Sequence, residues 1–223
     1  DLSGVKIMWT NYPNMPTGAA ASEDLYAKLV DFGRRHGILI CNDNPYSFIL
    51  NDRPLSILAE PGAKECGLEL NSLSKAHNMA GWRIGMVAAE PEIISEILKV
   101  KSQMDSGMFK PLQVAAVEAL SQGPEWFAEL NAEYARRRVL AGEIFDMLGA
   151  EYDHDSTGMF LWGRVGQAGA EVSDKLLYEA GVFITPGFIF GKNGDNYIRI
   201  SLCSKPEVLK RAAEKIKAVI QKD

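Results

Sequence analysis

Three polar clusters in this sequence hold side chains that could take part in chemistry. They are Asn11 to Gly18, Asp43 to Tyr46 and Ser72 to Lys75. They contain an amine that can act as a nucleophile or proton carrier, a carboxylate, a phenol, and hydroxyls that can hold an anion. Each cluster also has a structural interpretation: a Pro-Thr-Gly turn, an aspartate that caps a helix, or a solvated surface lysine.

Each of these clusters follows a short apolar run, and such runs predict strands. Four strands are predicted in this way, over residues 5–10, 38–41, 68–73 and 82–89. Between the first two, Ser22 can cap a helix and Gly37 can end it. Strands that alternate with helices predict an α/β fold with a mostly parallel sheet flanked by helices. Ligands bind beyond the carboxyl ends of the strands in such sheets, which is where the clusters lie.

After Pro91 the apolar residues recur at helical spacing. They predict an amphipathic face formed by Ile93, Ile94, Ile97 and Leu98, a helix over residues 112–120, and a long helix that Pro124 opens. A small α+β unit follows, with strands at residues 160–162 and 197–202, and a capping box at residues 204–207 that starts a last helix. The predicted domains are a partial large domain (1–123), a connecting helix (124–149) and a small domain (150–223).

Four motifs occur in a fixed order along the chain. They are Asp43-Asn44-Pro45-Tyr46, Ser72-Leu73-Ser74-Lys75 with Gly81-Trp82-Arg83-Ile84-Gly85, Pro186-Gly187-Phe188-Ile189-Phe190-Gly191, and Tyr197-Ile198-Arg199-Ile200-Ser201. Together they resemble the active site of the class I and II aminotransferases, which are fold-type I enzymes that use pyridoxal 5'-phosphate. In that family a phosphate-binding arginine follows the cofactor lysine by eight positions, as Arg83 follows Lys75. The resemblance covers essentially the whole chain.

The resemblance implies roles for three side chains around the cofactor ring. Lys75 would bind the cofactor covalently and carry a proton, which suits lysine because desolvation readily lowers its pKa. Asp43 would keep the pyridine nitrogen protonated, so that the ring withdraws electrons. Tyr46 would donate its hydroxyl to the ring oxygen. The structural alternatives are a turn aspartate and a core tyrosine.

The resemblance also implies two sites for anions. Ser72, Ser74 and Arg83 would hold the cofactor phosphate, because hydroxyls and a planar guanidinium suit it. Arg199 would bind the α-carboxylate of the substrate. It is flanked by isoleucines in a predicted strand, where an unpaired charge would be costly. Its alternative partner is an acidic side chain of the same chain.

One position departs from the family pattern. The first turn of the family usually reads Asn-Pro-Thr-Gly, and its asparagine bonds to the cofactor. The corresponding residue here is Met15, which has no hydrogen to donate. Asn11 or Asn14 could take over this contact, or it could be absent, so we assign the role to no residue.

Composition bears on the class of partner. Apolar residues make up 47% of the chain and charged residues 24%, as in globular proteins. The net charge of −5, without runs of like charge, argues against nucleic acid or an anionic membrane. No apolar stretch approaches the roughly 20 residues of a membrane span. The three cysteines and three histidines lack metal-ligand spacing, so we expect no metal and a cytoplasmic location.

We expect an enzyme that moves an amino group between an L-amino acid and a 2-oxo acid and that forms a homodimer. Two alternatives remain open. A lyase or decarboxylase of this fold would use the same lysine, aspartate and arginine, and a transcription regulator can contain a sensor domain of this kind. The motifs do not identify the amino acid. Residues 104–109 could border a substrate pocket or form a loop between helices.

The chain begins at Asp1, without a methionine, and almost directly enters its first predicted strand. The resemblance implies an upstream region that completes the sheet and supplies a phosphate loop and an aromatic ring that stacks on the cofactor. We therefore expect an N-terminally truncated fragment without bound cofactor, which pairs with another copy and does not catalyse amino transfer alone.

Overall fold

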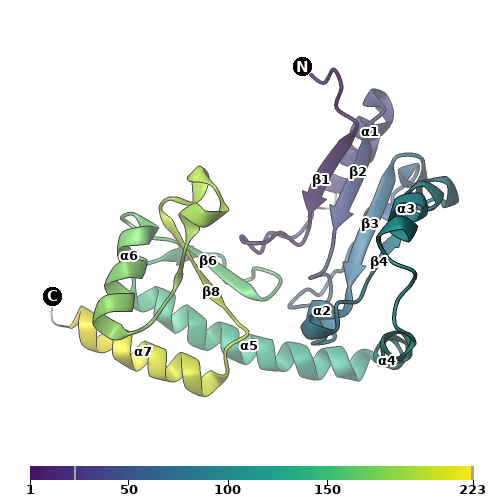
Figure 1. Ribbon diagram of the computed structural model, residues 1–223. Helices are drawn as coiled ribbons and strands as arrows, with labels where there is room; N and C mark the ends of the chain where they lie inside the picture. Colours follow the sequence, from purple (N-terminus) through teal and green to yellow (C-terminus); the bar gives the residue numbers. More distant parts are fainter. Residues whose placement is uncertain (23, 222–223) are drawn as a thin grey trace. The chain divides into compact units, whose positions relative to one another are not determined.

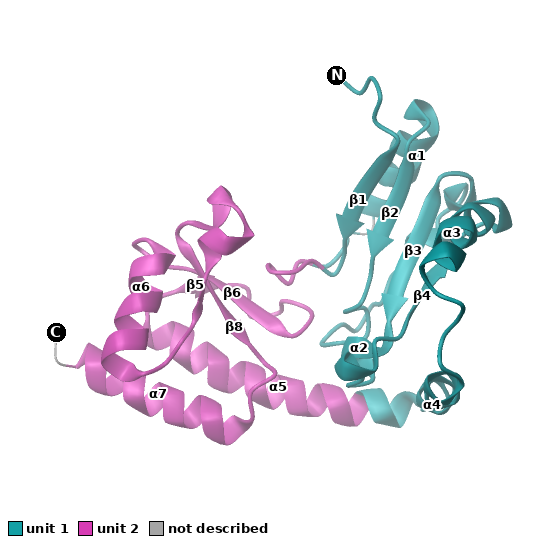
Figure 2. Ribbon diagram, in the orientation of Figure 1, with its two compact units in different colours: residues 1–13, 20–127 teal, residues 14–19, 128–223 magenta. Residues whose placement is uncertain are grey.

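The computed structural model of the protein (Figure 1) describes residues 1–22 and 24–221. The chain forms two compact units, which Figure 2 shows in different colours. Unit 1 contains Asp1–Pro13 and Ala20–Phe127, and unit 2 contains Asn14–Ala19 and Ala128–Asp223. Residues 14–19, which the predicted boundaries place in the large domain, therefore belong with unit 2.

A four-stranded sheet forms the centre of unit 1. Its strands, in spatial order, are β1 (Ile7–Asn11), β2 (Leu39–Asp43), β3 (Gly67–Ser72) and β4 (Gly85–Ala88). The first three strands run parallel, and β4 is antiparallel to β3. The prediction of a mostly parallel α/β sheet is confirmed. The observed strand ends differ from the predicted ends by a few residues, because pairing with the neighbouring strand sets them.

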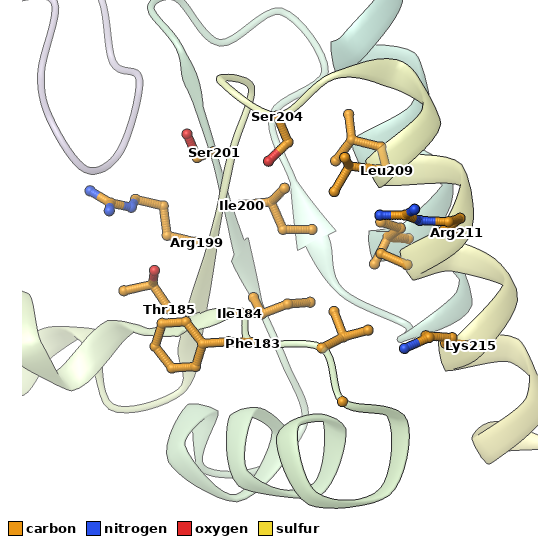
Figure 3. A pocket seen from close by; sticks show the side chains of 15 residues that line it. Phe183, Ile184, Thr185, Arg199, Ile200, Ser201, Ser204, Leu209, Arg211 and Lys215 are labelled. Carbon is orange, nitrogen blue, oxygen red and sulfur yellow. The ribbon is translucent and has the colours of Figure 1, made fainter. Parts of the chain in front are cut away.

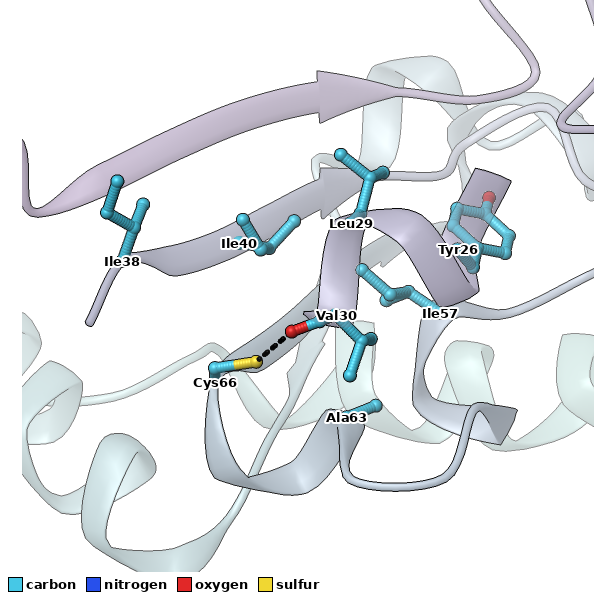
Figure 4. Close-up of a cluster of buried hydrophobic side chains, with 8 residues drawn as sticks. All are labelled: Tyr26, Leu29, Val30, Ile38, Ile40, Ile57, Ala63 and Cys66. Carbon is cyan, nitrogen blue, oxygen red and sulfur yellow. Dashed lines mark hydrogen bonds between the residues drawn. The ribbon is translucent and has the colours of Figure 1, made fainter. Parts of the chain in front are cut away.

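The core of unit 1 lies between β2 and helix α1 (Leu25–His36). Figure 4 shows its buried side chains, which are Tyr26, Leu29, Val30, Ile38, Ile40, Ile57, Ala63 and Cys66. Gly33 permits close approach of the helix, since a Cβ atom there would lie 2.8 Å from the Ile38 carbonyl oxygen. Burial of this apolar cluster fixes β2, and with it the polar residues at its end.

The two ends of α1 contrast with each other. Gly37 ends the helix at a φ of 63°, a left-handed conformation that glycine adopts without strain. The predicted cap at Ser22 is wrong. The helix begins after Asp24, no side chain caps it, and the Ser22 hydroxyl donates to the Asp24 carboxylate at 2.8 Å instead. Ser22 lies two residues before the N-cap position, too early for its oxygen to accept from the first turn.

The other helices of unit 1 include two that bury no residue completely. The regular helices are α2 (Leu73–Ala76), α3 (Pro91–Met104) and α4 (Lys110–Leu120), and 3₁₀ turns occur at Ile57–Ala59, Ala63–Glu65 and Ala80–Trp82. Neither α3 nor α4 contains a fully buried residue. On the predicted face of α3, Leu98 is 54% exposed, so unit 1 covers that face only in part.

Unit 2 combines an antiparallel sheet with helices. In spatial order its strands are β5 (Glu151–Tyr152), β6 (Phe160–Arg164), β8 (Tyr197–Ser201) and β7 (Thr185–Pro186). The helices are α5 (Pro124–Met147), of which residues 128–147 lie in unit 2, α6 (Gly169–Lys175) with a π-helical turn (Leu176–Ala180), 3₁₀ turns at Gly187–Phe190 and Lys192–Gly194, and α7 (Pro206–Ile220). The predicted α+β character of this part is confirmed.

The predicted capping box at residues 204–207 is wrong. Helix α7 begins at Pro206, its N-cap is Lys205, and no side chain accepts a hydrogen bond from its first turn. Proline suits the first helical position because it has no N–H group to satisfy there. In the described part of the chain, no helix is both long and apolar enough to cross a membrane.

Candidate active site

The carboxyl ends of the three parallel strands meet at one edge of the sheet of unit 1. Asn11 ends β1 and is paired in register with Asp43, which ends β2. Asp43 is in turn paired with Leu70, two residues before Ser72 ends β3. The Asn11 side-chain amide donates to the Asp43 carbonyl oxygen at 2.7 Å. Asn11, Asp43 and the end of β3, where the third polar cluster begins, therefore lie along this edge, whereas residues 14–18 of the first cluster belong to unit 2.

Asp43 presents its carboxyl group on the face opposite to its buried neighbours. Asn42 and Asn44 are 0% and 2% exposed, whereas the Asp43 side chain is exposed, as alternation along a strand requires. The surrounding protein still desolvates this carboxyl group in part and raises its pKa above the usual value. Tyr46, in the following turn, has a buried side chain.

Ser72 organises the single turn of α2 that carries Lys75. Its hydroxyl accepts a hydrogen bond from the Ser74 backbone N–H at 3.0 Å and lies 2.8 Å from the Ser74 hydroxyl. Leu73 and Ala76 of the same turn are buried, while Ser74 and Lys75 are half-buried. The turn is therefore anchored by its apolar residues and directs its polar residues outward.

Arg83 adopts an unusual backbone conformation beside this turn. Its φ of 55° lies in the left-handed region, which is strained for a residue with a side chain. Its guanidinium Nη1 donates to the Ala80 carbonyl oxygen at 2.9 Å, and the residue is exposed. Two residues later, Gly85 pairs with Ser72. Such strained residues concentrate at functional sites, which favours the functional interpretation of Arg83.

Arg199 lies in unit 2, at the middle of β8. Its guanidinium carbon is 4.1 Å from the centre of the Phe160 ring and 4.6 Å from that of Phe190, and Nη1 contacts the Met15 sulfur at 3.3 Å. Figure 3 shows the side chains of Arg199 and Ile200 extending to opposite sides of the strand. Aromatic faces attract cations and fix a guanidinium without neutralising it.

A cavity of about 410 Å³ extends along β7, β8 and α7 in unit 2 (Figure 3). Its described lining includes the cations Arg199, Arg211 and Lys215 among mostly apolar side chains. Arg211 and Lys215 favour an anionic group in this cavity, whereas the Arg199 side chain extends to the other side of β8 from Ile200.

Several contacts in the two units escaped the sequence analysis. The aromatic rings of Phe160 and Phe190 on Arg199 come from distant segments, and no local pattern indicates them. The buried pair Asn42 and Glu69 had a weak signal, since each is a polar residue inside an apolar strand. At Met15, the residue that departs from the family pattern, the structure shows a sulfur contact to Arg199.

Comparison with known sequences gives the family of the chain. Residues 2–216 match the family described as aminotransferase class I and II. An LL-diaminopimelate aminotransferase of Natranaerobius thermophilus is 42% identical over 219 residues, which cover 96% of this chain and 57% of the relative. Another from Aquifex aeolicus is 41% identical, with 95% and 56% covered. The chain thus spans somewhat more than half the length of these curated relatives.

Solved structures agree with this match. The apo structure of BacF from Bacillus subtilis has a TM-score of 0.90 and 36% identity, and the match covers 96% of this chain and 56% of that chain. For the aromatic aminotransferase from Pyrococcus horikoshii the TM-score is 0.89 and the identity 31%, with 97% and 60% covered. With its motifs in order and almost its whole length matched, the chain belongs to the aminotransferase class I and II family.

Proposed function

We propose that the protein containing this chain transfers an amino group between an L-amino acid and a 2-oxo acid, with pyridoxal 5'-phosphate as cofactor. The observation that carries this proposal is the position of Lys75. It lies in the turn that Ser72 caps, at the same sheet edge as Asp43. In a member of the aminotransferase family, this amine is the group expected to bind the cofactor.

The side chains at this edge fit the chemical groups of the cofactor. The cofactor has an aldehyde, a phosphate, a ring hydroxyl and a pyridine nitrogen, and when bound it withdraws electrons from the α-carbon of the substrate. We assign the Lys75 amine to the aldehyde, the Asp43 carboxylate to the protonated nitrogen and the Tyr46 phenol to the ring oxygen. Ser74 and Arg83 supply hydrogen-bond donors of the kind that phosphate requires.

Ser72 completes the proposed phosphate site by orienting Ser74. Its hydroxyl hydrogen is directed to the Ser74 oxygen or to the Ile84 carbonyl oxygen, at 2.8 and 3.2 Å. The Ser74 hydroxyl keeps its own hydrogen, which it can donate to a phosphate oxygen. The two serines therefore act as one unit.

During turnover, Lys75 Nζ would take the proton from the substrate α-carbon and deliver it to the aldehyde-derived carbon of the cofactor, since an amine can serve as a general base and then as a general acid. Asp43 would hold the proton on the pyridine nitrogen throughout. In unit 2, Arg199 would bind the substrate α-carboxylate, and its two aromatic neighbours support a planar, two-pronged hydrogen bond.

The names of relatives indicate which substrate to test first. The curated relatives at 36–42% identity are named LL-diaminopimelate aminotransferases. A structural relative at 31% identity is named an aromatic aminotransferase. We therefore place LL-diaminopimelate first among the candidate substrates and aromatic amino acids second.

We also propose that the protein is a cytoplasmic homodimer. Cys41, Cys66 and Cys203 are free thiols, as in proteins of a reducing compartment. Helices α3 and α4 leave apolar side chains exposed, including Val114 and Val117, which are 60% and 70% exposed. A second copy of the chain would cover such residues.

The proposal can be tested on the full-length protein loaded with cofactor. Borohydride reduction should attach the cofactor covalently to Lys75, and peptide mapping locates the label. Lys75→Ala should lower the rate of amino transfer by at least roughly 10²–10⁴-fold, because it removes the proton carrier. A label found on Lys64 or Lys101 instead would contradict the assignment.

A second measurement separates amino transfer from the alternative reactions of this fold. Only a transferase needs a 2-oxo acid acceptor for repeated turnover, whereas a lyase or decarboxylase does not. We expect product formation from LL-diaminopimelate to stop after one equivalent when 2-oxoglutarate is omitted. Continued turnover without an acceptor would indicate a lyase or decarboxylase.

A further inference from the structure

A buried polar network lies directly behind Asp43. Asn42 is completely buried, and its side-chain amide donates to the Tyr26 hydroxyl oxygen at 3.2 Å and to the Glu69 carboxylate at 3.3 Å. The Thr10 hydroxyl donates to the Asn42 side-chain oxygen at 3.1 Å. This Asn42 network (Thr10, Tyr26, Asn42 and Glu69) connects β1, α1, β2 and β3.

Glu69 is the charged member of the Asn42 network. It is only 8% exposed, and the two donors that reach its Oε2 are neutral: the Asn42 amide and the Ile57 backbone N–H at 3.1 Å. Burial, together with the nearby Glu69 carboxylate, raises the pKa of Tyr26 to about 12, so Tyr26 stays neutral. Burying a carboxylate whose hydrogen-bond donors are all neutral costs stability. A functional role for Glu69 therefore explains its position better than a contribution to stability does.

The Asn42 network fixes the strand end from which Asp43 projects. Because side chains alternate along β2, holding Asn42 on the inner face sets the direction of Asp43 on the outer face. The next residue is also held, since the Asn44 backbone N–H donates to Leu70 and its side-chain amide to Leu55, at 2.8 and 3.3 Å. Asp43 is thus an exposed carboxylate between two immobilised neighbours.

We infer that Asn42 and Glu69 are positioning residues that hold the Asp43 carboxylate in place for the pyridine nitrogen of the cofactor. This inference rests on the proposed function. Neither residue touches the reacting atoms. They act through the strand that carries Asp43, as supporting side chains do when a reactive group must be held within a fraction of an ångström.

The experiment compares Glu69→Leu with Glu69→Gln in the full-length protein. Glutamine keeps an oxygen that can accept from Asn42 and Ile57, whereas leucine removes it. With ¹⁵N-labelled cofactor, the nitrogen signal reports protonation of the ring. We expect Glu69→Leu to move this signal toward the neutral ring and to lower kcat by about 10- to 100-fold, as small displacements of reactive groups do. Glu69→Gln should keep the signal and most of kcat.

Ile40→Ala is the matched control for general loss of stability. Ile40 is fully buried on β2, two residues before Asn42 on the same face, and has no polar side-chain atom. The Ile40→Ala substitution should lower the melting temperature of the protein without changing the nitrogen signal. The inference is overturned if Glu69→Leu keeps the parent signal, or if Ile40→Ala shifts it equally. A parent protein that shows no protonated ring nitrogen would instead contradict the proposed function itself.

Discussion

Asp43 illustrates the conflict between stability and function at a single residue. Its folded-state pKa is raised by partial desolvation, so the folded protein holds this proton more tightly than the unfolded chain does. Ionisation of Asp43 therefore lowers stability as the pH rises from the unfolded pKa of about 3.9 through the folded value. At neutral pH the parent protein carries this cost in full, and a protonated pyridine nitrogen would offset it.

Asp43→Asn should consequently stabilise the cofactor-free protein at pH 7. We expect a gain of no more than about 1 kcal/mol, because solvent screens an exposed carboxylate. The gain should shrink at pH 4, where much of the parent Asp43 is protonated. Urea unfolding of the parent and the variant at pH 7 and at pH 4 measures the gain at each pH. A variant that is less stable than the parent at pH 7 would show that Asp43 makes a favourable native interaction.

Arg199 shows how a cation can be held within a sheet by aromatic rings. Arg199→Lys keeps the charge but loses the planar group that stacks on Phe160 and Phe190. Losing one partner of a buried charge pair costs about 2–5 kcal/mol, so Arg199→Ala should lower kcat/KM for the amino acid by about 100-fold or more. Lysine should recover only part of this loss.

The comparison substrate for Arg199 is an amine that lacks the α-carboxylate. Its turnover should change little in Arg199→Ala, because the arginine has no group to bind in this substrate. Equal losses for the amino acid and the amine would mean that Arg199 supports the fold of unit 2 instead.

At the level of elements, the strands of unit 1 could be predicted because each is a local apolar run that turn residues end. Their ends also align Asp43 and the turn of Lys75, since parallel strands share a carboxyl edge. Helix caps could not be predicted equally well. Ser22 is near a helix start, but the helix begins at Leu25 with Asp24 as its N-cap, and sequence alone does not set this boundary to within two residues. The contact of Asn42 with Glu69 depends on strand register, which composition does not specify.

The turn that begins at Gly187 positions Phe190 beside Arg199. A Cβ atom at Gly187 would lie 2.3 Å from the Gly194 carbonyl oxygen and 2.7 Å from the Trp162 ring. The Gly187 turn and the turn that contains Gly194 would therefore have to move apart. Gly187→Ala should destabilise unit 2 by about 1–3 kcal/mol or more, as overpacking does. Urea unfolding followed by tryptophan fluorescence measures this.

Gly166→Ala is the control for this prediction. Gly166 also lies in unit 2, but a Cβ atom there meets nothing within 4 Å. The free energy of unfolding of the Gly166→Ala protein should stay within about 0.5 kcal/mol of the parent value, as for most surface substitutions. If Gly187→Ala is as stable as Gly166→Ala and the parent, the close packing at Gly187 relaxes without cost.

For the whole molecule, the order of residues along the chain does not determine which unit they join. Residues 14–19 lie early in the sequence, yet the Gly18 carbonyl oxygen accepts hydrogen bonds from the Thr157 backbone N–H and hydroxyl, at 2.8 and 2.9 Å. A Cβ atom at Gly18 would lie 2.8 Å from Ser156. Contacts across about 140 residues leave no local signal, so the sequence could not place this segment. It brings Met15 to Arg199 within unit 2.

Helix α4 exposes apolar residues that we propose a second copy of the protein covers. Val114 and Val117 are one turn apart on the helix and strongly exposed, and Phe109 just before the helix is 71% exposed.

Val117→Glu should weaken pairing of two copies of the full-length protein, since a charge would have to be desolvated in an apolar interface. Sedimentation velocity should show a concentration-dependent shift from dimer to monomer. Glu118→Gln, on the same helix, should leave the dimer intact. A Val117→Glu protein that remains fully dimeric at the lowest measurable concentration would exclude α4 from the interface.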